Sequence, residues 1–403
     1  MNNRISRQRV IISFLIYASI VTATWGDSIF SINGLGELAY PIGGQARGMG
    51  GVNLAFLDGR GVSLINPAIT GTVDTTTVAG LFLFEQRRVK NSFARSTIYS
   101  WGPRFLHLII PLSFGMVLGG GIAPFSDVNF HLTREEEVFG EAYTLDVAAE
   151  GGTRLGSLTL AKNIGNRLYL GLAVNLIFGS ITEEWKRVFA NPEFVSSNDR
   201  CKSSYYGQAY IGGIAIRPHP RLTLGAMHSR SGNIKATTER RTVSGILEEE
   251  EKQLDFPHAY GLGLTYQLTP RLTIGGDMYT RLWEKFRSEG TQIPTYKNTT
   301  RFSFGCELTP SGDKMAPFFM KVPWRAGLYH EPGYYEDESG NRVSETFFTL
   351  GTSLFFKEDR GAVDLAFEVG RRGDIAENGA QEWVFRQSFS IVGWERWFQK
   401  REY

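Results

Sequence analysis

Residues 168–178 read Leu-Tyr-Leu-Gly-Leu-Ala-Val-Asn-Leu-Ile-Phe, with a large apolar side chain at every second position. The residues between them are mostly small or polar. A period of two is typical of a β-strand, whose side chains point alternately to the two faces of a sheet. The pattern recurs over residues 260–268 and 363–370. Because soluble strands average about five or six residues and membrane-crossing strands need about 9–11, these lengths favour a transmembrane barrel.

Turn signals divide the chain into about fourteen strands, an even number as in bacterial outer-membrane barrels. We expect strands near residues 73–88, 98–112, 115–134, 141–162, 168–187, 202–217, 222–241, 250–268, 272–287, 298–308, 322–336, 343–356, 361–374 and 381–398. Short turns alternate with longer loops near 189–201, 242–250, 288–297 and 335–343. The sequence therefore predicts an all-β fold, a closed antiparallel barrel over residues 71–403, with the longer loops outside and both chain ends in the periplasm.

The chain begins with the pattern of a secretory signal. Arg4, Arg7 and Arg9 precede an apolar run from residue 10 to residue 24, and small residues follow near Gly26. We therefore assign residues 1–26 to a signal peptide. An uncleaved anchor helix is the alternative, but the run is shorter than the ~20 residues that a membrane span requires.

Composition excludes several classes of protein. The net charge of the 403 residues is +2, without the concentrated basic face that nucleic-acid binding needs. Aromatic residues make up 13% of the chain, and there are 46 glycines, which fits aromatic girdles and tight strand packing. The strand assignment places Cys201 and Cys306 at opposite ends of non-neighbouring strands, so we expect no disulfide.

The sequence contains no motif that indicates a catalytic or metal-binding site. The six histidines are scattered, without the spacing of a zinc motif, and the two cysteines add no ligand pattern. No GxSxG stretch indicates a nucleophile. We expect no metal site, no cofactor and no enzymatic activity, and a surface enzyme with a triad at one rim is a minor alternative.

The segment before the first strand has no period of two and carries two short motifs. Residues 43–52 contain Arg47, Gly48, Met49, Gly50 and Gly51, and the segment ends in Asn66-Pro67-Ala68. This resembles the N-terminal hatch of the FadL-type family of outer-membrane transporters of hydrophobic compounds. Residues 254–264 and 268–275 look like the central hairpin of that family. Each motif alone is common in turns and loops. The resemblance rests on their joint occurrence with the signal peptide and the even number of strands.

The resemblance implies a function and a division of the chain. Residues 27–70 would form a hatch inside the barrel, and the protein would take up hydrophobic, fatty-acid-like small molecules passively across the outer membrane of a Gram-negative-type bacterium. In this family the third barrel strand is kinked and gives a sideways exit. The expected partners are outer-membrane lipids, a hydrophobic small-molecule ligand and, during biogenesis, the barrel-assembly machinery, to which the aromatic end over residues 394–403 is suited. We expect a monomer and no nucleic acid.

The third expected strand contains residues that weaken sheet pairing. Gly119, Gly120 and Gly121 are followed by Pro124 and Phe125. Proline cannot donate to a strand ladder, and glycine often marks a bulge. These five residues are a candidate lateral gate, and the alternative is that they only bend the barrel at a corner.

One departure from the family leaves a second function open. Fatty-acid transporters of this type have long outer loops that collect substrate, whereas the tip here spans only residues 134–141. The same fold includes shuttle barrels of type IX secretion, which bind partner proteins. A barrel that binds or shuttles secreted proteins is therefore the alternative to a transporter.

The alternation of side chains also assigns charges to the lumen. We expect the lipid-facing positions to include Ile274, Phe302, Phe304, Trp324, Leu328, Leu365 and Phe367. The positions between them place a charge cluster inside the barrel, consisting of Asp277, Glu307, Arg325, Asp364 and Glu368. Charges on the lipid side would cost about 2–4 kcal/mol.

Charges inside a filled lumen need partners. The expected hatch offers Arg47 and Arg60. We predict that at least one of them pairs with an acid of the cluster and that Arg325 bridges others. The alternative is that the acids pair only with arginines of the strands or with water.

Overall fold

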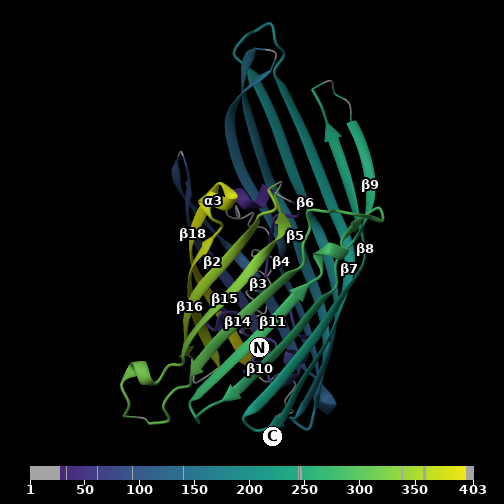
Figure 1. The fold of residues 1–403 in the computed structure, drawn as a ribbon. Coiled ribbons are helices and arrows are strands. Elements are labelled where there is room, and N and C mark those ends of the chain that lie inside the picture. Colours follow the sequence, from purple (N-terminus) through teal and green to yellow (C-terminus); the bar gives the residue numbers. More distant parts are fainter. Residues whose placement is uncertain are drawn as a thin grey trace, which may run out of the picture.

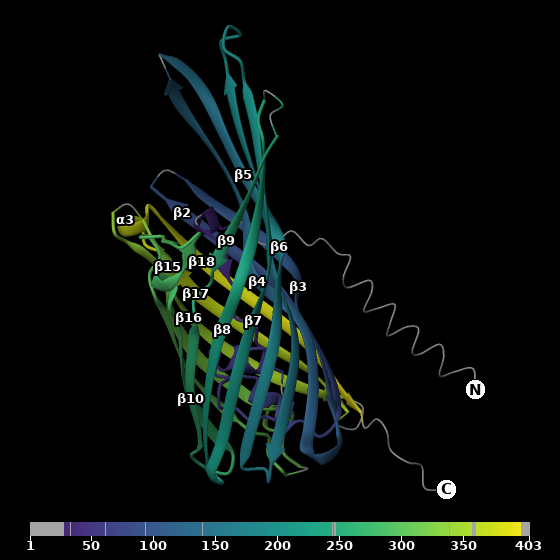
Figure 2. The same ribbon diagram turned by 90° about the vertical axis from the view of Figure 1, so that its right-hand side faces the viewer.

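The computed structural model describes residues 28–395, except 33, 61, 93, 139, 244, 246, 314, 338 and 357–359. The expected signal peptide and the aromatic end beyond residue 395 lie outside the described residues. The chain forms a closed antiparallel barrel of 14 strands (Figures 1 and 2). The wall consists of β2 (Thr76–Asn91), β3 (Arg95–Pro111), β4 (Met116–Val138), β5 (Glu141–Ile164), β6 (Leu168–Phe189), β7 (Ser197–His219), β8 (Leu222–Arg241), β9 (Leu247–Asp255) with β10 (Ala259–Gln267), β11 (Leu272–Arg281), β14 (Thr299–Leu308), β15 (Trp324–Glu336), β16 (Arg342–Phe356), β17 (Gly361–Arg372) and β18 (Ala380–Glu395).

The barrel closes where its last strand pairs with its first. β18 runs antiparallel to β2 from Glu395↔Thr76 to Ala380↔Asn91. The expected fold class is confirmed, and each expected strand is present with ends shifted by a few residues. The strand expected over 250–268 differs, because β9 and β10 both pair with β8 and are separated at residues 256–258. The expected outer loop 288–297 carries a small hairpin, β12 (Arg287–Ser288) and β13 (Thr291–Gln292).

Two sides of the barrel differ in height. β4 to β8 have 20 to 24 residues each, whereas β10, β11 and β14 have 9 or 10. The long strands rise beyond the rest of the barrel as a projecting wall (Figures 1 and 2). We call this the outer end. The acidic runs at residues 135–137 and 248–251 lie in β4 and β9, near the tips of these strands at the outer end.

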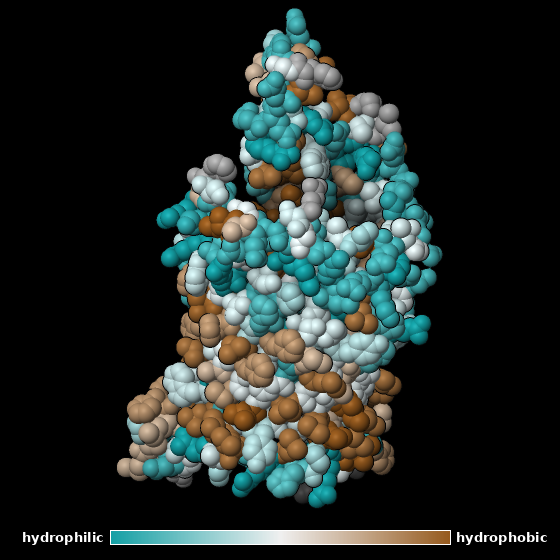
Figure 3. Space-filling model, in the orientation of Figure 1, coloured by the Kyte–Doolittle hydropathy of each residue, from teal (hydrophilic) through white to brown (hydrophobic). Residues whose placement is uncertain are grey.

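The outside of the barrel is apolar over its lower part. Figure 3 shows apolar side chains gathered around the base and polar side chains on the projecting wall. Six of the seven positions expected to face lipid are exposed, and Leu365 is half-buried. None of the described helices is long and apolar enough to cross a membrane. Cys201 and Cys306 are both free, as expected.

The N-terminal segment, residues 28–72, lies within the barrel (Figure 2). It contains η1 (Ile29–Ile32), β1 (Glu37–Leu38), α2 (Gly44–Gly48) and η2 (Pro67–Thr72). Its backbone approaches the wall so closely that a Cβ atom on the facing wall residue would overlap it. The closest of these approaches are at four wall glycines on different strands, which we call the glycine belt: Gly171, Gly225, Gly305 and Gly327.

Candidate functional site

The motif residues of the N-terminal segment hold it against the wall and fold it locally. The Asn66 side chain accepts a hydrogen bond from the Ala68 N–H and donates one to the Leu54 carbonyl oxygen at 2.7 Å. Pro67 follows this cap as the first residue of η2. Gly50 has a φ of +67°, and its N–H donates to the Thr349 hydroxyl at 2.8 Å. Asparagine at the cap and glycine at positive φ are the residues that these conformations favour.

Two arginines of the N-terminal segment form ion pairs with wall carboxylates. Arg47 lies 2.8 Å from Glu368, and Arg60 lies 2.8 Å from Asp364. Both acids are almost completely buried. The predicted pairing between the segment and the charge cluster is therefore present twice.

The other members of the charge cluster have different partners. Arg325 donates to Glu307 at 2.6 Å and to the Ser353 hydroxyl at 2.7 Å, and Ser353 in turn donates to Asp364. Arg325 thus bridges two acids, as expected. Asp277 forms no ion pair with a described arginine and accepts hydrogen bonds from the backbone N–H groups of Asn53 and Leu54 at 2.6 and 2.8 Å. No side-chain pattern in the sequence signals backbone donors of this kind.

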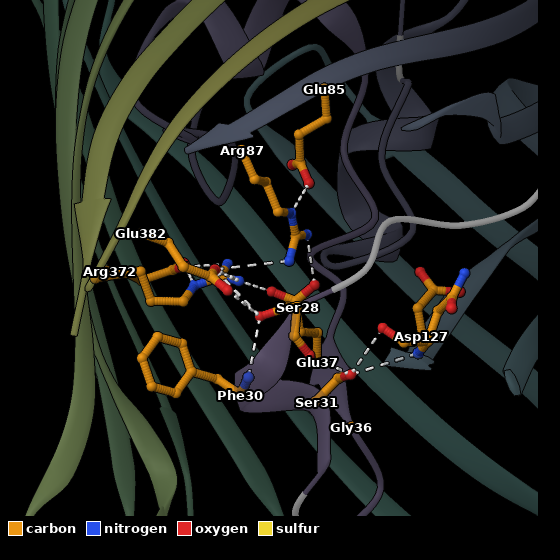
Figure 4. Close-up of polar contacts among 12 residues, drawn as sticks. Ser28, Phe30, Ser31, Gly36, Glu37, Glu85, Arg87, Asp127, Arg372 and Glu382 are labelled. Carbon is orange, nitrogen blue, oxygen red and sulfur yellow. Dashed lines mark hydrogen bonds and ion pairs between the residues drawn. The ribbon is translucent and has the colours of Figure 1, made fainter. Parts of the chain in front are cut away.

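A second charged cluster was missed by the sequence analysis. Glu37 of β1 contacts Arg87 of β2 and Arg372 of β17, and the Ser28 hydroxyl donates to Glu382 of β18 at 2.9 Å (Figure 4). These residues tie the start of the segment to the barrel seam. The available signal was that Glu85 and Arg87 follow apolar residues at the inward positions of β2.

The third barrel strand, β4, leaves its neighbour β3 half-way up the wall. The two strands pair only from Pro111↔Val117 to Leu106↔Ile122. Gly119, Gly120 and Gly121 lie in this paired part, where two of them face His107. Pro124 and Phe125 lie just beyond it, at a bulge in the pairing of β4 with β5. The candidate-gate residues therefore have two different roles. The glycines make room for the His107 side chain, and Pro124 lies just beyond the end of the pairing between β3 and β4.

The N-terminal segment covers the edge of β4 that β3 leaves free. Glu37 and Leu38 of β1 pair with Asp127 and Ser126 of β4. The Ala39 N–H donates to the Phe125 carbonyl oxygen at 2.9 Å. A short stretch of the segment thus takes the place of a wall strand at this gap.

Two cavities lie inside the barrel on either side of residues 39–41. One cavity is lined mainly by charged side chains, among them Glu37, Glu85, Arg87, Arg301, Glu368 and Arg386. The other is lined mainly by apolar side chains of the segment and of β5 to β8, among them Leu64, Leu155, Ile177, Ala209, Ile211 and Met227. Ala39 and Pro41 line both. Burial raises the pKa of the neighbouring Tyr40 phenol well above its usual value, so this group stays neutral.

Aromatic side chains close the outer side of the apolar cavity. Phe256, from the break between β9 and β10, stacks on Phe125 with ring centroids 5.8 Å apart. Beyond them lies a buried cluster that includes Trp283, Phe286, Tyr296 and Tyr334. Because Phe125 also lines the cavity, the cavity reaches the gap between β3 and β4.

Arg281 lines the apolar cavity, and its guanidinium group lies over aromatic rings. Its guanidinium carbon lies 5.3 Å from the Phe125 ring centroid and 5.7 Å from that of Trp283, and it donates to the Tyr279 hydroxyl at 3.0 Å. It forms no ion pair with any described residue. Cation–π contacts stabilise such a charge only in part.

Comparisons with known proteins agree with this architecture. The model of the BamG family matches residues 4–403. No curated protein sequence matches the chain. Among solved structures, a Pseudomonas aeruginosa FadL homologue is similar with a TM-score of 0.64 and 14% identity, over 88% of this chain and 98% of that one.

Two toluene transporters have the same fold. TbuX of Ralstonia pickettii aligns with a TM-score of 0.59 and 14% identity, over 88% of this chain and 98% of its own. TodX of Pseudomonas putida aligns with a TM-score of 0.57 and 16% identity, over 90% and 99%. The chain is thus an outer-membrane barrel with the FadL-type fold, and it belongs to the BamG family.

Proposed function

We propose that this protein is a non-catalytic outer-membrane channel for passive uptake of hydrophobic small molecules. The observation that carries the proposal is the apolar cavity between the N-terminal segment and β5 to β8, next to the gap between β3 and β4. Apolar cavities with a few placed polar groups are the usual form of small-molecule sites. The solved structures of the same fold include transporters of toluene.

The route runs from the outer aromatic cluster to the side of the barrel. A ligand would pass between the rings around Phe256, occupy the apolar cavity and leave where Phe125 meets the gap. Exit requires residues 37–39 to leave the edge of β4, which breaks a short stretch of pairing and the ion pairs of Glu37 with Arg87 and Arg372. Transfer of an apolar molecule from water into lipid is favourable by itself, so no energy source is needed.

Arg281 favours a ligand with an acidic head group. Arg281 is half-buried, and a cation that is partly removed from water without a carboxylate partner is unfavourable in an apolar environment. The carboxylate of a fatty-acid-like molecule would supply that partner while the part of its chain next to the carboxylate enters the cavity, whose volume is about 50 Å³. The ligand class we propose is therefore a hydrophobic monocarboxylic acid.

Two variants and a matched control test this function. Ala209→Phe fills the apolar cavity and should abolish binding and cellular uptake of a radiolabelled long-chain fatty acid. Arg281→Gln should lower affinity for the acid about tenfold and leave affinity for its methyl ester unchanged. Leu172→Phe, at a lipid-facing position that is 69% exposed, is the control. Full uptake by Ala209→Phe would refute the transport route, and equal losses for acid and ester in Arg281→Gln would refute the ligand class.

The projecting wall favours a second candidate function, the binding of partner proteins. β5 has 24 residues, about twice what crossing the membrane requires, and the family name points to the barrel-assembly machinery. In this function the protein would remain associated with that machinery or with a secreted protein. Shortening both β5 and β6 at the tip by residues 141–146 and 184–189 should then abolish co-purification of the partner and spare fatty-acid binding. If the shortened barrel still co-purifies with the partner and still binds fatty acid, the partner-binding function is refuted and only the transporter remains.

A further inference from the structure

The lipid-facing surface carries a depression on the low side of the barrel. It spans β8, β10, β11, β14 and β15, and its rim is formed by large exposed side chains such as Leu224, Leu262 and Phe304. Its floor is formed where small residues take outward positions: Ala226, Gly276, Cys306 and Ala326. Almost all of its lining is apolar, so an occupant within the bilayer must be apolar as well.

Polar side chains mark the outer edge of this depression on four strands, β8, β10, β11 and β14. Tyr260 of β10 is the pairing partner of His228 of β8 and of Thr280 of β11. The Thr280 and Thr300 hydroxyls are 3.1 Å apart. Each of these residues lies two positions beyond a lipid-facing apolar residue on its own strand, so the row indicates the outer membrane–water boundary.

Basic side chains gather at this edge above β8 and β10. His228 Nε2 and His258 Nδ1 are 3.2 Å apart, and the His228 ring stacks on Tyr260 with centroids separated by 4.8 Å. Arg230 follows His228 on the outward face of β8, and Lys285 lies in η4 (Trp283–Lys285). Both are exposed, and neither forms an ion pair with a described residue.

Basic side chains of this patch act together on one imidazole. Burial, followed by His228, Arg230 and Lys285, lowers the pKa of His258 from its usual value. No carboxylate is among the groups that act on His258. An anion at this edge would therefore meet basic groups without competing with a built-in carboxylate partner.

We propose that the depression and the basic patch together form a binding site for a phosphorylated, multi-acyl lipid of the outer leaflet. The acyl chains lie over Ala226, Gly276 and Ala326, and a head-group phosphate lies between Arg230, Lys285 and the two imidazoles. The two parts are contiguous, because alternate residues of β8 run from Leu224 and Ala226 directly to His228 and Arg230. The site is on the outside of the wall and is separate from the transport route inside it.

Charge complementarity identifies the occupant. A second barrel would have to bury Arg230 and Lys285 against its own lipid-facing surface, which is apolar at this depth. A zwitterionic lipid brings an ammonium as well as a phosphate and gains less from basic side chains that lack an acidic partner. An outer-leaflet lipid that carries two phosphates on several acyl chains satisfies both the patch and the depression.

Native mass spectrometry of the purified barrel tests the proposal with three probes of the same acyl composition. These are lipid A with two phosphates, with one phosphate and with none. We expect affinity to fall in that order. Arg230→Gln and Lys285→Gln should each lower the affinity for the doubly phosphorylated form about fivefold, since a basic residue near a membrane surface contributes about that factor.

Matched variants separate the two parts of the site. Ala226→Phe with Ala326→Phe fills the depression and should weaken all three lipids while keeping their order. Arg221→Gln, an exposed basic residue at the opposite end of the β8 hairpin, is the control and should change nothing. All of these positions face outward, so the barrel is expected to fold, which its heat-modifiable migration on gels checks. Equal affinity for the phosphorylated and phosphate-free lipids, unchanged binding in Arg230→Gln with Lys285→Gln, or a dimer in place of bound lipid would each overturn the proposal.

Discussion

The two halves of the lumen use their inward positions differently. On the side of β2 and β15 to β18, the inward residues include charged side chains that pair with one another and with Glu37, Arg47 and Arg60 of the N-terminal segment. On the side of β5 to β8, inward residues are apolar or small and leave a cavity. The segment is therefore anchored by charge on one side, and on the other by packing and a hydrogen bond from Asn66 to the Ile214 carbonyl oxygen. A barrel built in this way can keep its segment in place and still leave room for a ligand.

The largest effect is expected from reversing an anchoring charge. Arg47→Glu places two carboxylates together at Glu368, and breaking a buried pair costs about 3–5 kcal/mol. We expect the segment to loosen and the barrel to conduct small ions in planar bilayers. The double variant Arg47→Glu with Glu368→Arg should partly restore the closed state. A closed Arg47→Glu barrel, together with a closed Arg60→Glu barrel, would show that the charged half is not what holds the segment.

A disulfide between the segment and β4 tests whether the segment moves. Leu38 and Ser126 are pairing partners, so Leu38→Cys with Ser126→Cys should form a bond in a background where Cys201 and Cys306 are serine. Fatty-acid uptake should stop and return on reduction. Val89→Cys with Ser96→Cys, which links β2 to β3 at another paired position, is the control. Unchanged uptake through the locked barrel would remove the sideways exit.

Surface labelling fixes which end of the barrel faces outward. Asn341, between β15 and β16, and Gly290, between β12 and β13, lie at the end of the barrel from which the wall projects. Asn166 lies at the other end, in the turn between β5 and β6. Each would be replaced by a single cysteine. Labelling of intact cells should succeed at the first two and fail at the third. The reverse pattern would invert the topology and place the charged seam of Ser28 and Glu382 on the inner side.

The smallest effect is expected at an exposed ion pair of the projecting wall. The side chains of Lys235 and Glu251 are 54% and 57% exposed. Exposed pairs contribute about 0–1 kcal/mol, so Glu251→Ala should leave the unfolding midpoint almost unchanged. A loss comparable to that of Glu368→Ala would mean that burial does not distinguish the two kinds of pair.

The sequence predicted the wall better than it predicted the interior. The alternation of side chains located the strands and the inward acids, because burial in lipid or lumen depends on a strict period of two. It also foresaw Arg47 and Arg60 as partners, since a buried carboxylate needs a cation. It did not place the aromatic cluster around Trp283, which lies where β9 and β10 separate and where no periodic pattern exists.

The lateral gap shows a different limit of the sequence. Pro124 correctly marked the end of pairing, but the glycines before it serve another purpose. Gly121 lies against the Leu106 carbonyl and His107, so valine there would press on β3 rather than repair the pairing. The strand that covers the gap, β1, has only two residues, too few to leave a pattern.

The glycine belt has a consequence for the order in which the barrel is assembled. At Gly171, Gly225, Gly305 and Gly327 the backbone of the N-terminal segment rests directly on the backbone of the wall. No side chain fits between these two backbones, so a larger residue at any of the four positions must displace either the segment or the wall. We therefore expect closure of the seam between β2 and β18 to depend on a segment that already lies in this position.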